Sequence, residues 1–320
     1  MSIGPGDRVA LVAPASPSPA ERLATAVGLV SSWGLTPVTF PSATDTSARA
    51  SYLSGTDRVR ANDVQQAWCD PDIAGIFCIR GGYGTVRILD LLEVDAMANA
   101  EPKPLYGSSD ITSLHEWLRE QLGVPTWFTP MLATDVMDDE LACDALRTAV
   151  LDPTSVRQWS SIDATTLVPG HAEGQLIGGN LSLLASTTGA RRRPRPETSG
   201  SMNGGCIALL EDYTESTYRI DGYLQTLLRS GWFDGVTGVA LGSWAECSPV
   251  EEIHALCLEV LGPLGIPIVG ALGFGHGPGA HSIPLGVPGV LSAGHTPTLQ
   301  LASGPDSRTP TLPSPGRQHR

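Results

Sequence analysis

The 320-residue chain lacks several features that mark particular classes of protein. No apolar run is long enough to cross a membrane, and the first residues lack the charged segment and apolar core of a secretion signal. The six cysteines are scattered, with no CxxC pair and no Cys/His cluster at metal-ligand spacing. We therefore expect a cytoplasmic protein in which Cys78 and Cys206, which lie inside apolar strand-like runs, are buried thiols.

Basic residues are also few. The chain has 20 Lys and Arg against 33 Asp and Glu, a net charge of −13. This excess of negative charge argues against nucleic acid or an anionic membrane as the main partner. A basic run at 191–196, inside a polar insertion at 187–205, is interpreted as a solvated loop rather than an anion-binding patch.

Apolar runs of strand length alternate with helical patterns, which predicts an α/β fold with parallel strands and flanking helices. With 41% hydrophobic residues, the chain can form about two domains. We expect strands at 8–13, 37–40, 73–79, 104–106, 174–180, 206–211, 239–244 and 266–272, and short antiparallel strands within 283–301. The expected helices are 18–33 with a Ser18 cap, 57–68 with a Thr56 cap, 85–92, 110–122, 218–231 and 249–261.

The domain prediction has four parts. An N-terminal α/β domain at 1–151 is followed by a connection at 152–170. A C-terminal α/β domain with some antiparallel strands spans 171–302, and a disordered tail rich in Pro, Ser and Arg spans 303–320.

Ser109 stands at a predicted turn between a strand and a helix. Gly107 permits the turn, and a helical apolar stripe follows from Ile111 to Leu122, where Gly123 ends the helix. A serine here is most often a simple N-cap. The alternative is a nucleophile, because its hydroxyl is raised clear of the backbone and the first helical N–H groups can receive an oxyanion.

Two further polar residues follow predicted strands. Glu211 ends an apolar run, and His276 lies in a glycine-rich loop. Taken singly, Glu211 would be a solvated cap or an ion-pair partner, and His276 a surface histidine. Together with Ser109 they give the chain order Ser, Glu, His, which known hydrolases use: histidine deprotonates the serine, and the carboxylate orients the histidine.

Five motifs occur in order along nearly the whole chain: 80–84 (RGGYG), 107–112 (GSSDIT), 172–180 (AEGQLIGGN), 210–212 with 218–221 (LED, YRID) and 274–276 (FGH). With these motifs the chain resembles the LD-carboxypeptidase family (family S66). These serine peptidases trim murein peptides, and the family includes the microcin C self-immunity hydrolases. Ser108 and Thr129 depart from the family pattern, where an aromatic residue or His and a Gly are common.

The resemblance implies roles for particular residues. Ser109 would be the nucleophile, Glu211 the orienting carboxylate and His276 the base. The backbone N–H groups of Asp110 and Gly82 would form the oxyanion hole. Arg80, Tyr83 and Asn180 would line the substrate cleft, where the planar guanidinium of an arginine matches a terminal carboxylate.

The function expected from the resemblance is release of terminal D-alanine from a murein tetrapeptide, by a homodimer without metal or organic cofactor. One alternative is an immunity-type hydrolase of aminoacyl-nucleotide antibiotics. The other is a peptide-binding protein without catalytic activity.

Overall fold

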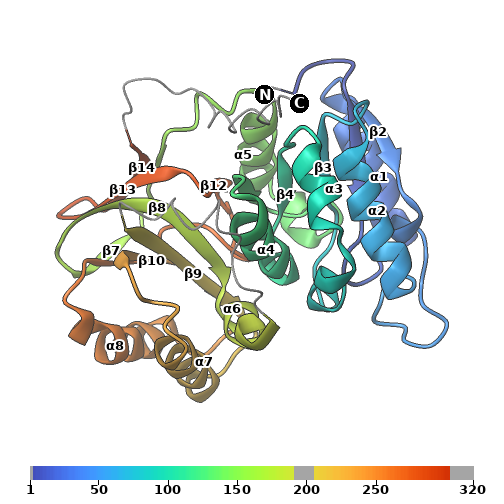
Figure 1. The fold of residues 1–320 in the computed structure, drawn as a ribbon. Helices are drawn as coiled ribbons and strands as arrows, with labels where there is room; N and C mark the ends of the chain where they lie inside the picture. Colours follow the sequence, from blue (N-terminus) through green and yellow to red (C-terminus); the bar gives the residue numbers. More distant parts are fainter. Residues whose placement is uncertain (1–2, 191–204, 303–320) are drawn as a thin grey trace, which may run out of the picture.

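The computed structural model describes residues 3–190 and 205–302, which form two β-sheets flanked by helices (Figure 1). The basic run at 191–196 and the tail at 303–320 lie outside the described residues. None of the described helices is long and apolar enough to cross a membrane.

The first sheet has six strands in the order β12-β5-β4-β3-β1-β2. Strands β1 to β5 are parallel, and β12 pairs antiparallel with β5 at the edge. The strands are β1 (Arg8–Val12), β2 (Thr36–Thr39), β3 (Gly75–Cys78), β4 (Leu105–Gly107), β5 (Thr126–Phe128) and β12 (Ile283–Leu285).

Helices cover both faces of this sheet, as an apolar parallel sheet requires. One face packs against α2 (Asp57–Cys69), α3 (Val94–Asn99) and α4 (Thr112–Leu122). The other face packs against α1 (Ala20–Ser32) and α5 (Glu140–Leu151). Thr56 caps α2 as expected, because its side chain accepts a hydrogen bond from the Val59 N–H.

The second sheet has eight strands in the order β6-β14-β13-β8-β9-β10-β11-β7. Its centre, β8 to β11, is parallel, and the outer strands are antiparallel. The strands are β6 (Gln158–Trp159), β7 (Thr165–Val168), β8 (Gly170–Asn180), β9 (Cys206–Tyr213), β10 (Val236–Ala245), β11 (Ile268–Gly270), β13 (Pro288–Ala293) and β14 (Thr298–Leu301).

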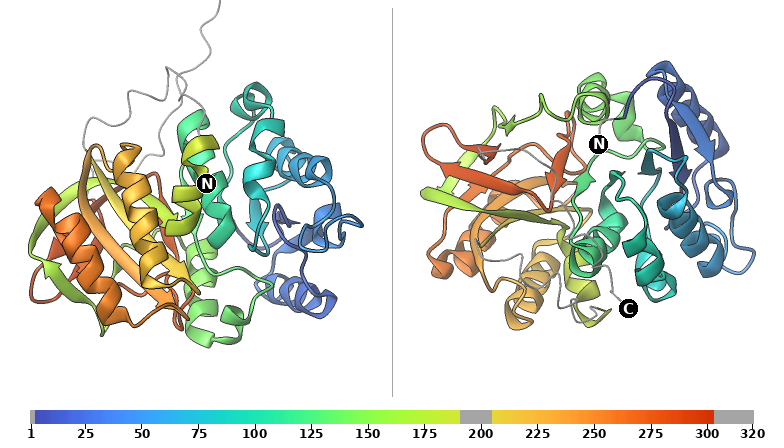
Figure 2. Two further views of the ribbon diagram at one scale, coloured as in Figure 1. Left: turned by 90° about the horizontal axis from the view of Figure 1, so that it is seen from below. Right: turned by 45° about the horizontal axis from the view of Figure 1, so that its top comes forward.

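Successive side chains of β9 face opposite sides of this sheet. Ala208 and Leu210 pack on the side covered by α6 (Leu181–Thr187), α7 (Thr217–Arg229) and α8 (Val250–Leu261). Figure 2 shows α7 and α8 side by side on this face. Ile207 and Leu209 face the other side, in a cluster that includes Phe128 of the first sheet. Both faces of β9 are therefore buried.

Several local predictions were wrong. Residues 85–92 form two 3-10 turns, Thr85–Arg87 and Leu89–Leu91, instead of one helix. Helix α1 begins at Ala20 after Pro19, and no side chain caps it. The expected connection at 152–170 contains β6, β7 and the first residue of β8, which belong to the second sheet. Strand β9 continues two residues beyond Glu211 to Tyr213.

Gly178 in β8 provides a test of this packing. Its φ is +113°, and a Cβ there would lie 2.2 Å from the Leu209 carbonyl oxygen of β9. We expect Gly178→Ala to lower the free energy of unfolding by at least about 2 kcal/mol, through backbone strain and a steric clash with a neighbouring strand. The measurement is thermal or urea unfolding.

Gly28→Ala is the matched control, because Gly28 lies inside α1 and a Cβ there would meet nothing within 4 Å. It should stabilise the protein by up to about 1 kcal/mol, since alanine favours a helix. Equal effects of the two substitutions would contradict this account of β8.

Candidate active site

Ser109 is the second residue after the end of β4. It adopts a backbone conformation that non-glycine residues rarely show. Its φ is +57°, in the left-handed region. A 3-10 turn, Ser109–Ile111, leads from it into α4, which Gly123 ends in a left-handed conformation. Such strained positions cluster at functional sites. The predicted turn from strand to helix is confirmed.

The glycine turn at 80–84 lies against Ser109. A Cβ on Gly81 would stand 2.9 Å from the Ser109 Cβ and 3.1 Å from its Oγ, so only glycine allows this approach. Ser16 holds the turn at two points: its N–H donates to the Gly81 carbonyl at 3.1 Å, and its Oγ accepts from the Tyr83 N–H at 3.2 Å. Gly82, with φ of +99°, makes no hydrogen bond through its N–H within the described residues.

Glu211 and His276 form a direct contact. The Glu211 side chain is fully buried in β9, and its Oε2 lies 2.6 Å from Nδ1 of His276, which comes from the loop after β11. Burial lowers the pKa of His276, but the Glu211 carboxylate, with a smaller contribution from Asp212, outweighs it and leaves the pKa raised. This contact fixes one ring nitrogen and directs the other, Nε2, away from Glu211.

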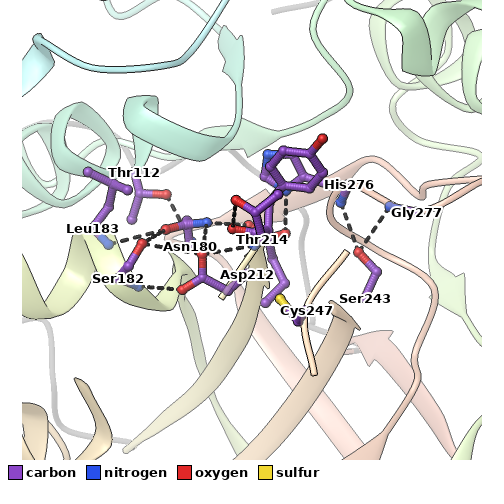
Figure 3. Close-up of polar contacts among 12 residues, drawn as sticks. Thr112, Asn180, Ser182, Leu183, Asp212, Thr214, Ser243, Cys247, His276 and Gly277 are labelled. Carbon is purple, nitrogen blue, oxygen red and sulfur yellow. Dashed lines mark hydrogen bonds and ion pairs between the residues drawn. The ribbon is translucent and has the colours of Figure 1, made fainter. Parts of the chain in front are cut away.

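Two further residues hold the imidazole in place. Oγ of Ser243, in β10, accepts the backbone N–H groups of His276 at 2.8 Å and Gly277 at 3.0 Å (Figure 3). The Tyr213 ring stacks on the imidazole, with centroids 5.1 Å apart and planes inclined by 17°. The backbone and the ring of His276 are therefore both restrained.

Asn180 lies behind Glu211, and its placement differs from the expectation. It is only 2% exposed and caps α6, instead of presenting its amide to a cleft. Its Nδ2 donates to Oε1 of Glu211 at 3.2 Å and to Oδ1 of Asp212 at 2.9 Å (Figure 3). Its amide is occupied by these buried contacts, so Asn180 supports Glu211 instead of lining the cleft.

Ser109 belongs to the other sheet, and within the described residues its Oγ makes no hydrogen bond to His276. Its helix contacts the Glu211 side through a hydrogen bond close to the site: Thr112 Oγ1, in the first turn of α4, accepts the Asn180 N–H at 3.0 Å. A Cβ on the preceding Gly179 would lie 2.6 Å from the same oxygen. The structure thus joins Glu211 and His276 directly, and ties Ser109 to them through the backbone of α4.

The side chain of Asp110 is fully buried, and its Oδ2 accepts the Thr85 N–H at 2.7 Å. Burial raises the pKa of this carboxyl group, against the lowering effect of its hydrogen bonds and of Arg60. Buried Arg60 in turn donates to the Gly84 carbonyl at 2.9 Å. Asp110 and Arg60 therefore attach the glycine turn to the Ser109 segment.

Arg80 and Tyr83 project from this turn. Arg80 is half-buried, and it has no hydrogen bond or ion pair within residues 3–190 and 205–302. Tyr83 is 46% exposed and lies beside Tyr52, with ring centroids 6.0 Å apart. Both side chains are accessible to a ligand.

The other histidines near these motifs have separate contacts. His115 is buried in α4, with Nε2 3.0 Å from the Gly107 carbonyl oxygen, and burial lowers its pKa to about 4. His281 contacts the Ser160 carbonyl. In the part of the chain that the structure describes, no three His, Cys, Asp or Glu side chains are grouped to hold a metal ion.

Sequence reasoning missed Gly81, Ser16, Ser243 and Tyr213, and it missed the support that Asn180 and Asp212 give to Glu211. Gly81 sits inside the motif at 80–84 and Tyr213 directly follows the motif at 210–212, so their positions were a usable signal. Ser16 and Ser243 act from loop and strand positions whose partners are distant in sequence, and no local pattern marks them.

Comparison with known protein families identifies this arrangement. Residues 9–129 match the model of the LD-carboxypeptidase N-terminal domain, and residues 173–291 match that of the C-terminal domain. The chain belongs to the LD-carboxypeptidase family. The family predicted from the motifs is confirmed, and with it a peptidase of the hydrolase class.

Relatives match this chain over nearly its whole length. A putative carboxypeptidase of Streptomyces coelicolor is 46% identical, covering 98% of this chain and 97% of its own. A murein tetrapeptide carboxypeptidase of Pseudomonas aeruginosa is 33% identical, covering 89% and 92%. The microcin C7 self-immunity protein MccF, solved with aspartyl sulfamoyl adenosine, has a TM-score of 0.78 at 20% identity and covers 94% and 98%. The mixed α/β fold is confirmed.

The Glu211–His276 contact predicts a measurable pKa change. Because the Glu211 carboxylate raises the pKa of His276, Glu211→Gln should lower that pKa. The measurement is the pH titration of the His276 imidazole resonance by NMR. The resonance of the surface histidine His171, which lies 3.5 Å from Glu173, is the internal control and should be the same in both proteins. An unchanged His276 pKa would show that the two groups do not interact in solution.

Proposed function

We propose that this peptidase is a serine-type enzyme in which Ser109, His276 and Glu211 act as one unit. The observation that carries the proposal is the buried Glu211–His276 contact, in a chain of this family that also holds Ser109 in a left-handed turn between strand and helix. This is the pairing of base and orienting carboxylate that a serine nucleophile needs.

In the proposed reaction, Ser109 Oγ attacks the scissile carbonyl carbon while Nε2 of His276 takes the hydroxyl proton. Glu211 accepts the Nδ1–H and stabilises the imidazolium that forms. The N–H groups of Asp110 and Gly82 donate to the tetrahedral oxyanion. The C–N bond then breaks, His276 gives its proton to the leaving amine, and water resolves the acyl-enzyme by the same steps in reverse order.

The proposed substrate is a murein tetrapeptide, cut at the L,D bond so that terminal D-alanine leaves. The relative from Pseudomonas aeruginosa, named a murein tetrapeptide carboxypeptidase, supports this choice. Arg80 has no anionic partner of its own within the described residues, so its guanidinium is free to pair with the terminal carboxylate. We also propose that the enzyme acts in the cytoplasm as a homodimer. Its role there would be to recycle cell-wall peptides.

The direct test is mass spectrometry of the products after incubation with a murein tetrapeptide. The unaltered enzyme should release D-alanine, and Ser109→Ala should be slower by at least about 1,000-fold, because the nucleophile is gone. Ser108→Ala is the matched control: this neighbouring serine makes no cap hydrogen bond, and its loss should leave most of the activity. Full activity of Ser109→Ala would refute the serine mechanism.

Arg80 gives a separate prediction about binding. Arg80→Lys keeps the charge and loses the planar two-point contact, so KM for the tetrapeptide should rise roughly tenfold with little change in kcat. Steady-state kinetics measure both constants. A tetrapeptide whose terminal carboxylate is amidated should show little difference between the two enzymes; an equal loss on both substrates would contradict the assignment.

The alternative substrate is an aminoacyl-nucleotide antibiotic. The likeness to MccF, which was solved with aspartyl sulfamoyl adenosine, supports keeping this alternative. Hydrolysis of that compound without hydrolysis of the tetrapeptide would make the antibiotic the favoured substrate. Failure of both compounds to acylate Ser109 would favour a peptide-binding protein without catalytic activity.

A further inference from the structure

A second carboxylate, that of Asp212, lies next to Glu211 and has no part in the proposed reaction. Asp212 is 1% exposed. Its Oδ2 accepts the Ser182 N–H at 2.8 Å, and its Oδ1 accepts the Tyr213 N–H at 2.9 Å. A buried carboxylate is costly unless hydrogen bonds compensate it, so these donors fix its position.

Asn180 connects the two carboxylates, because its Nδ2 donates to both Glu211 and Asp212. The amide cannot turn over without losing contacts. Its Oδ1 accepts the Leu183 N–H at 3.1 Å and the Ser182 hydroxyl at 2.8 Å, and an amide nitrogen could accept neither (Figure 3). The donor side of Asn180 is therefore locked toward Glu211 and Asp212.

The same residue also faces the nucleophile helix. The Asn180 N–H donates to Thr112 Oγ1 in the first turn of α4, three residues beyond Ser109. Asn180 therefore contacts both Glu211, the carboxylate paired with the base, and α4, the helix that follows the nucleophile. These two parts of the site come from different sheets.

The electrostatic setting of Asp212 includes groups from several elements. Glu211 precedes it on β9, His276 comes from the loop after β11, Tyr223 lies on α7, and Cys247 follows β10. Burial, followed by the Glu211 charge, raises the pKa of Asp212 to about 6, against its hydrogen bonds. Among these groups only His276 can become positive, so the negative charge of Asp212 stabilises the protonated form of His276.

We propose that Asp212 and Asn180 are positioning residues: they fix Glu211 and hold the base against the nucleophile helix. The proposal rests on the proposed serine mechanism for its effect on activity. The direction of the effect that Asp212 has on His276 follows from electrostatics. Removing the negative charge of Asp212 makes His276 lose its proton at lower pH, and it weakens the stabilisation of the imidazolium formed during the reaction.

The kinetic test compares Asp212→Asn with the unaltered enzyme on a tetrapeptide from pH 5 to 9. We expect the acid limb of kcat/KM to move down by about one pH unit and kcat on the plateau to fall about tenfold, with KM nearly constant. Glu215→Gln is the matched control: Glu215 lies on the same segment, but it contacts Tyr223 and Arg219, so the limb should stay in place. A loss of kcat with an unmoved acid limb would reduce Asp212 to a structural residue and overturn the proposal.

A second measurement needs no substrate, and it follows the unaltered protein. In the unaltered protein the His276 imidazole resonance, assigned by its loss in His276→Ala, should show a second, smaller inflection besides its own titration, at the pH where the nearby Asp212 gains its proton. A single inflection would also overturn the proposal. If the NMR coupling is present and no substrate is cleaved, the proposed function fails and the buried network stands.

Discussion

The burial of the Glu211 carboxylate is the constraint on which the site depends. Its side chain has no exposed surface, so it is stable as a charge only beside a partner that replaces water. His276 supplies that partner at 2.6 Å, and Asn180 supplies a second donor. Gly275 is required for the same reason, since a Cβ there would lie 2.6 Å from Glu211 Oε2. The shape of the loop around His276 follows from the carboxylate that it has to cover.

A second constraint comes from the division of the site between two sheets. The nucleophile candidate follows β4, whereas the base and its carboxylate belong to the other sheet. Strand β12, from the C-terminal half, pairs with β5 and extends the first sheet, while Phe128 of β5 packs into the core of the second. These interlocked cores hold the two halves together. The hydrogen bond between Asn180 and Thr112 then sets the local approach of β8 and α4.

Much of this arrangement could be predicted from the sequence. The alternation of strands and helices gave the fold class, and the order of five motifs gave the family, because such patterns are local. The glycine-rich turn, the serine turn and Glu211 were located for the same reason. Distant partnerships were not predictable: the role of Asn180 depends on Thr112 and Asp212, which lie 68 and 32 residues away. The pairing of β12 with β5 joins residues more than 150 positions apart, and no local pattern encodes it.

The central claim is that Ser109, His276 and Glu211 form one reactive unit. Its most direct test is the rate at which a fluorophosphonate probe labels the protein, with the labelled residue mapped by peptide mass spectrometry. We expect a single adduct on Ser109 that forms much more slowly in His276→Ala and in Glu211→Gln. Labelling of Ser109 at the same rate in all three proteins, or labelling of another serine, would contradict it.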